Sequence, residues 1–267
     1  MAELEDWTCS FNGLVMGEPD SAISIVAVDG LLTLPELRTS DLTMVQRHGL
    51  FAGDDYMNGR TVTLTLEIYG STREEFTAAL NAVQAAFLPV QAEKPLTFRF
   101  PGAAADQTAY VMVRPRRRSA PLDLNFANMV CNVVVELFAT SPYIEADAVT
   151  TLPTLSSPWA GSAPKLRFTI DSSVPVRPVI TISNPYNPSI NNEITGEHFG
   201  VMRAHSYPLV IDAFNERVTA NGTDVSGDIA PGSVWPEWSF GDQRLNLYSG
   251  SLTGPSTASI SFRNRWV

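Results

Sequence analysis

The segment from Thr61 to Tyr69 constrains the fold most, because its apolar and polar residues alternate strictly. Valine, leucine and isoleucine occupy every second position, with threonines and one glutamate between them. This period of two is typical of a strand with one buried face. The next residues, Ser71 to Glu75, hold two overlapping pairs with the spacing of a helix capping box. We therefore expect a helix to follow the strand at once.

The helix is predicted over residues 72–88 and ends before Pro89, which cannot continue it. Its apolar residues fall on one stripe: Phe76, Leu80, Val83 and Phe87. A helix this short is marginal by itself in water, so the stripe must pack on a sheet. Further strands are predicted over 94–100, 110–114 and 129–138. The first domain, residues 1–148, is therefore expected to be α+β with one principal helix.

The composition changes after residue 148. Residues 149–164 are rich in Thr, Ser, Pro, Gly and Ala, and are predicted to be a linker. Beyond it, short β-like runs alternate with turn signals such as Asn221-Gly222, a strong signal for a two-residue hairpin turn. Such short strands predict a β-sandwich over residues 165–267. The fold class is thus mainly β.

The charge balance argues against a protein that grips nucleic acid. The formal net charge is −10, whereas phosphate binding requires an excess of Lys and Arg. The acidic N-terminus does not resemble a signal peptide, and no apolar run reaches the length of a membrane span. Synthesis in a cytoplasm is the expectation.

A search for catalytic or metal-binding patterns indicates no enzyme. The three histidines, His48, His198 and His205, do not form a metal-binding motif, and no nucleophile elbow or phosphate loop occurs. Adjacent Asp54 and Asp55 point to opposite sides of an extended chain, so a solvated loop is preferred. Cys9 and Cys131 are interpreted as buried free thiols, with a disulfide as the less favoured alternative. No metal or cofactor is expected.

Two further features have both functional and structural interpretations. The basic run Arg116-Arg117-Arg118 either contacts an acidic neighbouring subunit or passing DNA, or is a solvated loop between strands. Trp235 either offers a ring on which a sugar stacks or packs within the sandwich. Packing is favoured for Trp238 and Trp266, and neither interpretation is favoured for Trp235.

The order of several segments resembles the siphophage distal tail protein (Dit) family. In the first half the resemblance lies in Arg47-His48-Gly49, Gly59-Arg60, the strand and helix just described, Phe87-Leu88-Pro89, and the run from Leu137 to Tyr143. In the second half it lies in Arg177 to Ile182, Ile190 to Asn192, Leu209 to Asp212 and Phe262 to Trp266. The resemblance spans nearly the whole chain, and the order of the motifs carries it.

The resemblance implies a structural virion protein with a β-barrel-like N-terminal domain and a galectin-like C-terminal β-sandwich. The N-terminal domains would form a ring, usually a homohexamer, between the tail tube and the tail-tip or baseplate hub. The implied partners are other copies of the chain, the tail tube protein, the hub and sometimes a receptor-binding protein. DNA would pass through the ring without specific binding. The implied location is the tail tip of the virion.

The segment from Thr39 to Gly59 contains many apolar residues without clear periodicity, and is hard to bury within one domain. Our hypothesis is that it lies as a belt against the neighbouring subunit. The residues expected at subunit and hub contacts are Arg47, Leu50, Phe51, Tyr56, Met57, Arg60, Arg116, Arg117 and Arg118. The alternative function is a carbohydrate-binding protein that contacts the host receptor, with Trp235 as its platform.

Overall fold

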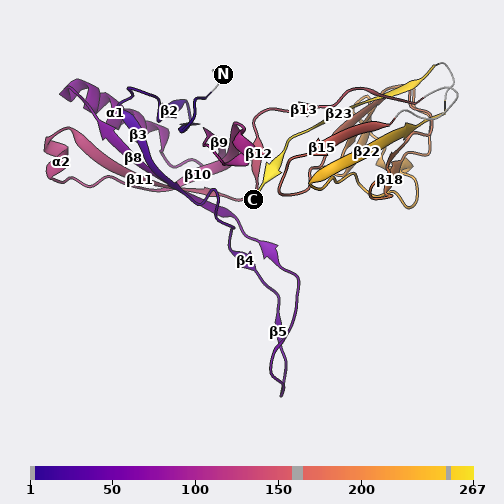
Figure 1. The fold of residues 1–267 in the computed structure, drawn as a ribbon, viewed down its shortest axis with the longest axis horizontal. Coiled ribbons are helices and arrows are strands. Elements are labelled where there is room, and N and C mark those ends of the chain that lie inside the picture. The colour runs from indigo at the N-terminus through magenta and orange to yellow at the C-terminus, as the bar shows by residue number, and fades with distance from the viewer. Residues whose placement is uncertain (1–3, 158–164, 251–253) are drawn as a thin grey trace. The chain divides into compact units, whose positions relative to one another are not determined.

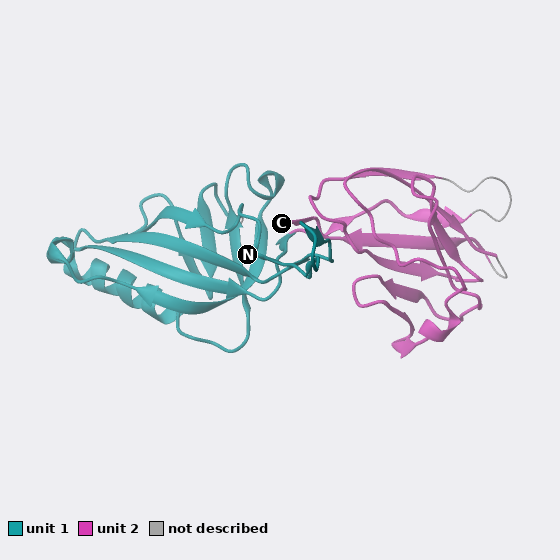
Figure 2. Ribbon diagram, turned by 90° about the horizontal axis from the view of Figure 1, so that it is seen from below, with its two compact units in different colours: residues 1–147, 267 teal, residues 148–266 magenta. Residues whose placement is uncertain are grey.

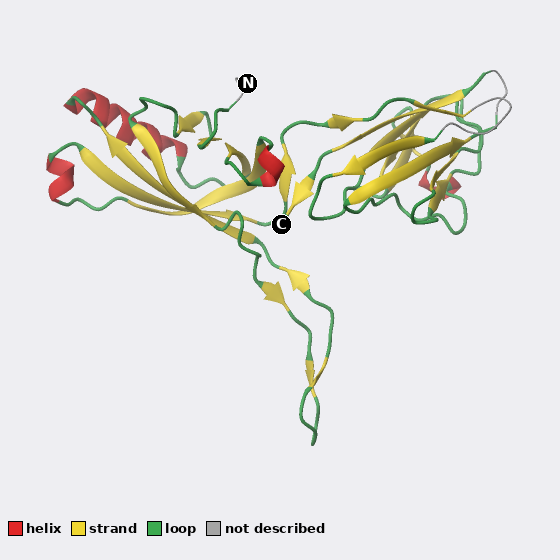
Figure 3. Cartoon of the chain, viewed as in Figure 1, coloured by secondary structure: helices red, strands yellow, loops and turns green. Residues whose placement is uncertain are grey.

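The computed structural model describes residues 4–157, 165–250 and 254–267 (Figure 1). The chain divides into two compact units, residues 1–147 with Val267, and residues 148–266 (Figure 2). Strands dominate both units (Figure 3). The mainly β fold class predicted from the sequence is confirmed. Among the described residues, no helix combines the length and apolar character needed to cross a membrane.

Unit 1 is built on an antiparallel sheet in the order β2-β1-β9-β10-β11-β8-β3, with β12 paired to β10. The strands are β1 (Thr8–Phe11), β2 (Leu14–Met16), β3 (Ile23–Asp29), β8 (Arg60–Tyr69), β9 (Lys94–Arg99), β10 (Ala109–Ser119), β11 (Val130–Ala139) and β12 (Ile144–Ala146). The alternation that predicted β8 is seen directly, since Val62, Leu64, Leu66 and Ile68 are fully buried. Both cysteines are free and buried, as predicted.

Strand β10 is longer than predicted and changes partner along its length. Ala109 to Val113 pair with β9, whereas Arg114 to Ser119 pair with β11. A bulge between Pro115 and Arg117 breaks the alternation of side chains. The run Arg116–Arg118 therefore lies in a strand, and the prediction of a loop there is wrong.

The principal helix, α1 (Arg73–Ala86), begins with the predicted capping chemistry. The hydroxyl of Thr72 accepts a hydrogen bond from the backbone amide of Glu75 at 3.2 Å. The Glu75 carboxylate accepts in return from the backbone amide and the hydroxyl of Ser71, at 2.9 and 2.6 Å. Phe76 and Val83 of the predicted stripe are buried, and the ring of Phe87, at the C-cap, stacks on Phe11. Two short helical turns complete the unit: η1 (Ala104–Asp106) and α2 (Leu124–Ala127).

The segment predicted as a long loop forms a β-hairpin that leaves the sheet between β3 and β8 (Figure 1). Its two short ladders pair β4 (Leu37–Arg38) with β7 (Tyr56–Met57), and β5 (Leu42–Thr43) with β6 (Leu50–Phe51). At its root, the backbone amide of Asn58 donates to the carbonyl of Glu36 at 2.8 Å. We call residues 36–58 the arm.

Unit 2 is a β-sandwich, as predicted. One sheet has the order β13-β23-β16-β19-β20-β21 with β14 beside β23, and the other has the order β15-β22-β17-β18. The strands of this unit are β13 (Thr150–Thr151), β14 (Leu155–Ser157), β15 (Leu166–Ile170), β16 (Val179–Ser183), β17 (Ser189–Asn192), β18 (His198–Gly200), β19 (Leu209–Asp212), β20 (Arg217–Ala220), β21 (Thr223–Asp224), β22 (Gly241–Tyr248), β23 (Ser256–Phe262) and β24 (Arg265–Trp266), with the turn η2 (Ser226–Asp228).

Both sheets of the sandwich contribute to one apolar core, which includes Trp238, only 2% exposed. The packing predicted for Trp238 is thereby confirmed. The Asn221-Gly222 turn is also confirmed: both residues have positive φ, and Ala220 pairs with Thr223. Part of the predicted linker, 149–164, differs from the expectation, because β13 and β14 pair with β23 and Leu155 is buried in the core. Residues 158–164 of that linker lie outside the described residues.

Candidate subunit interface

The arm exposes apolar side chains that nothing in unit 1 covers. Val45 is 85% exposed and Phe51 is 59% exposed, and Leu42, Leu50 and Tyr56 are exposed to a similar degree. Met57 is half-buried. Exposed apolar side chains gathered on one element are typical of a surface that another molecule covers. The arm therefore has the character of an interaction element.

The two sides of the arm are held together by hydrogen bonds between its own strands. The hydroxyl of Ser40 donates to the carbonyl of Asp54, and the carboxylate of Asp41 accepts from the amide of Gly53, both at 2.9 Å. These bonds give the ribbon a defined shape although its side chains are exposed. Asp54 and Asp55 are both exposed, as expected for solvated carboxylates.

Arg60 lies at the base of the arm and is buried, with only 2% of its surface exposed. Its Nη1 donates to the carbonyls of Gly30, Leu31 and Thr33, just before the arm, and its Nε donates to the carbonyl of Pro142 at 3.0 Å. Burial lowers its pKa, but an arginine stays protonated throughout the physiological range. Carbonyls of its own unit bind most of this side chain, and a contact of Arg60 with a neighbouring subunit stays a prediction.

A hollow of about 450 Å³ opens beside Arg60 at the arm base. It is lined by Gly30, Thr33, Leu34, Pro35, Glu36, Asn58, Gly59, Arg60, Thr61 and Phe138. Gly59 is needed where the arm rejoins β8, because a Cβ there would come within 2.7 Å of the Phe138 ring and 2.5 Å of the Ala139 carbonyl oxygen. The hollow is therefore formed by the residues of the arm root itself.

The basic run adjoins this hollow through one residue. The guanidinium of Arg116 stacks over the Phe138 ring at 5.2 Å from its centroid. Arg117 pairs with Glu136 at 3.5 Å, and Arg118 donates to the carbonyl of Gln84 in α1 at 2.6 Å. The structure thus brings Arg116 to the arm base, whereas Arg47, Leu50 and Phe51 lie near the arm tip.

Phe138 and Leu34 were not predicted as site residues, although both line the hollow. Phe138 occupies an ordinary strand position in the sequence, and only its pairing opposite Thr61 brings it next to the arm root. No signal in the sequence marks that neighbourhood.

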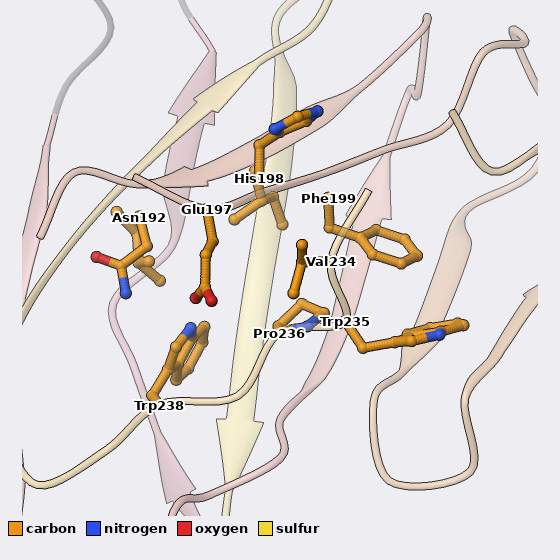
Figure 4. A pocket seen from close by; sticks show the side chains of 10 residues that line it. Asn192, Glu197, His198, Phe199, Val234, Trp235, Pro236 and Trp238 are labelled. Atoms are coloured by element: carbon orange, nitrogen blue, oxygen red, sulfur yellow. The ribbon is translucent and has the colours of Figure 1, made fainter. Parts of the chain in front are cut away.

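The pocket beside Trp235 in unit 2 is too small for a sugar. Figure 4 shows the side chains that line it. Its volume of about 20 Å³ is close to the roughly 10–15 Å³ that one water needs. The half-buried Trp235 ring lies 4.6 Å from the Phe199 ring and packs against the sandwich core. Stacking of a sugar on the outer surface of Trp235 stays a prediction.

The histidines and carboxylates do not converge on a catalytic site in the described part of the chain. His48 is exposed on the arm and His198 is exposed on β18, while His205 lies 3.4 Å from a carboxylate oxygen of Asp228. No group of three His, Cys, Asp or Glu side chains able to hold a metal ion occurs among those residues.

Comparisons with known proteins show the fold. No family model matches the sequence, and no curated protein sequence matches it either. The crystal structure of the Dit protein of phage SPP1, described as a paradigm of the hub adsorption apparatus in phages that infect Gram-positive bacteria, is 14% identical with a TM-score of 0.67. Chains of the phage P2 baseplate in its activated conformation are 10% identical. The calcium form has a TM-score of 0.45 over 92% of this chain and 91% of that chain, and the strontium form 0.47 over 96% and 97%. Since the match to the SPP1 protein covers 97% of this chain and 99% of that chain, the chain has the fold of a Dit protein.

Proposed function

We propose that this chain is a structural virion protein, a ring-forming distal tail protein that connects the tail tube of a long-tailed bacteriophage to its tail-tip or baseplate hub. The Dit fold supports this role, and the exposed apolar arm of unit 1 is the observation that carries it. Unit 1 would make the ring, and its surfaces rather than a catalytic site would perform the function.

The size of the arm supports a subunit contact. Positions 36 to 58 amount to 23 residues, within the range of about 20–30 residues that each side of a standard interface contributes. If the arm of each copy binds a different surface on the next copy, the contact is heterologous, and repetition closes a ring. A ring of six is the stoichiometry that we propose.

The partners follow from this position. One face of the ring would bind the tail tube protein and the other the hub, with a receptor-binding protein as a further partner. The net charge of −10 suits a ring through which DNA passes, because an acidic protein does not hold phosphates. The location that we propose is the virion tail tip, after synthesis in the bacterial cytoplasm.

Replacement of residues 39–55 by Asn-Gly tests the proposal. The new two-residue turn keeps the pairing of Arg38 with Tyr56 while it removes the exposed part of the arm. We expect the unaltered chain to have a native mass near six times that of one subunit, and the shortened chain to be a folded monomer by light scattering and circular dichroism.

A matched pair of triple variants separates the arm from exposed apolar surface in general. Leu42, Leu50 and Phe51 are changed to serine in one variant, and the exposed Ile194, Met202 and Phe240 of unit 2 in the other. Only the first should abolish the ring. An unaltered chain that stays monomeric at high concentration, or intact rings without the arm, would contradict the proposed function.

A further inference from the structure

We propose that the tip of the arm binds in the hollow at the arm base of the next copy, beside Phe138 and Arg60. This inference rests on the proposed ring and names the surface that receives the arm. The donor is the apolar tip, with Val45, Leu50 and Phe51, and the receiver is the hollow of about 450 Å³.

The hollow suits apolar side chains from another molecule. Leu34, Pro35 and Phe138 line it, and Leu34 is 56% exposed, so apolar surface is available at its rim. The volume is many times the roughly 10–15 Å³ that one water needs, so the hollow can admit side chains. Burial of a leucine or phenylalanine side chain there would stabilise the contact by removing apolar surface from water.

The reach of the arm matches the width of the unit that it would have to cross. Ten residues separate Glu36 at the root from Gln46 at the tip, which corresponds to about 33 Å for extended chain. Without the 23 residues of the arm, the 148 residues of unit 1 leave a body of 125, for which a compact chain has a radius of gyration of about 14 Å, or a diameter of about 36 Å. The tip can therefore reach the equivalent hollow of an adjacent copy, while its own hollow lies at the opposite end of the ribbon.

The charges of donor and receiver are complementary. The tip carries the guanidinium of Arg47, and the carboxylate of Glu36 lines the hollow that would receive it. The exposed Arg116, stacked on the ring of Phe138, is opposite in charge to Asp54 and Asp55 of the arm. This complementarity favours docking of the arm in one orientation and makes assembly faster at low salt.

A disulfide between the tip and the hollow tests the inference. In the variant with Phe51→Cys and Leu34→Cys, each arm would be linked to the next copy if the tip lies in the hollow, since a disulfide needs Cα atoms within about 7 Å. The natural thiols are buried, and burial raises the pKa of Cys9 to about 12, so their background reaction is slow. The control combines Phe51→Cys with Leu88→Cys, because Leu88 is 54% exposed but lies outside the hollow.

On mild oxidation, we expect the first variant to give a ladder of covalent oligomers up to the full ring on non-reducing gels. The control variant should give no ladder. Two outcomes would contradict docking of the tip in the hollow: no ladder in the first variant although its rings keep their native mass, or an equal ladder in the control variant. Neither outcome would contradict the ring itself. A monomeric unaltered chain is a different outcome, because it removes the proposed function as well.

Discussion

The guanidinium of Arg60 donates through Nε to the carbonyl oxygen of Pro142, a residue 82 positions later in the chain, at 3.0 Å. The same guanidinium binds the carbonyls of Gly30 and Leu31 where the chain enters the arm. One buried cation thus fastens the arm root to the segment that follows β11.

Change of Arg60 to methionine should lower the free energy of unfolding of unit 1 by on the order of 3 kcal/mol, because the buried carbonyls lose charge-assisted hydrogen bonds. Urea denaturation measures the loss. Arg47→Met, at the exposed arm tip, serves as the control and should change the stability by less than about 0.5 kcal/mol. Equal stability of the two variants would show that Arg60 does not fasten the arm root.

Change of Thr72 to alanine should destabilise unit 1 by about 1 kcal/mol, because the hydroxyl caps the amide of Glu75 at the start of α1. The matched control is Thr77→Ala, at an exposed position inside the helix, where alanine is the better helix former. Thermal unfolding should show a lower Tm for the first variant and no decrease for the second. A similar decrease in both would contradict the capping role.

Glu75 should make the stability of unit 1 sensitive to acid. Hydrogen bonds from the hydroxyl and the backbone amide of Ser71 hold the pKa of its carboxyl below the ordinary value of 4.5. A pKa that is lowered in the folded state stabilises that state at pH values above the ordinary pKa of the carboxyl. This stabilisation is lost as the pH falls through the lowered pKa. The Tm difference between the unaltered chain and Glu75→Gln should therefore be largest near pH 7 and close towards pH 3. A difference that is independent of pH would exclude this linkage.

Two tryptophans of unit 2 should differ in their effect on stability. Trp238 packs edge-on against Phe168 at 5.3 Å inside the core, so Trp238→Ala should cost about 3–5 kcal/mol. Trp235→Ala, at a half-buried site, should lower the free energy of unfolding clearly less, as measured by urea denaturation.

Glycan arrays with the Trp235→Ala variant address the carbohydrate alternative. Glycan binding by the unaltered chain that is lost in Trp235→Ala would favour that alternative.

Periodicity predicted the parts of the fold that pack on a core. The alternation in β8, the capping residues of α1 and the Asn221-Gly222 turn each specify a local structure, and the tertiary contacts agree with them. The strand at Arg116–Arg118 could not be predicted in this way, because its residues are all charged and a bulge interrupts the pattern. Pairing with β11 alone makes this segment a strand.

The candidate interface was predicted only in part. Exposed apolar residues without periodicity indicated an element that needs a partner, but not that it is a hairpin, because its short ladders involve only two residues on each side. The burial of Arg60 was missed for a different reason. Arginine is rarely buried, and only the arrival of carbonyls from distant segments makes its position inside the unit stable.

Both strands of the arm leave the sheet next to each other, with the Asn58 amide bonded to the Glu36 carbonyl. A hairpin rooted in this way can be lengthened or shortened by paired insertions without any change to the sheet beneath. Two extra residues on each side would extend the hairpin by about 7 Å. All the existing side chains would stay on their original faces. In the ring that we propose, the number of residue pairs in the ribbon would therefore determine the spacing between subunits.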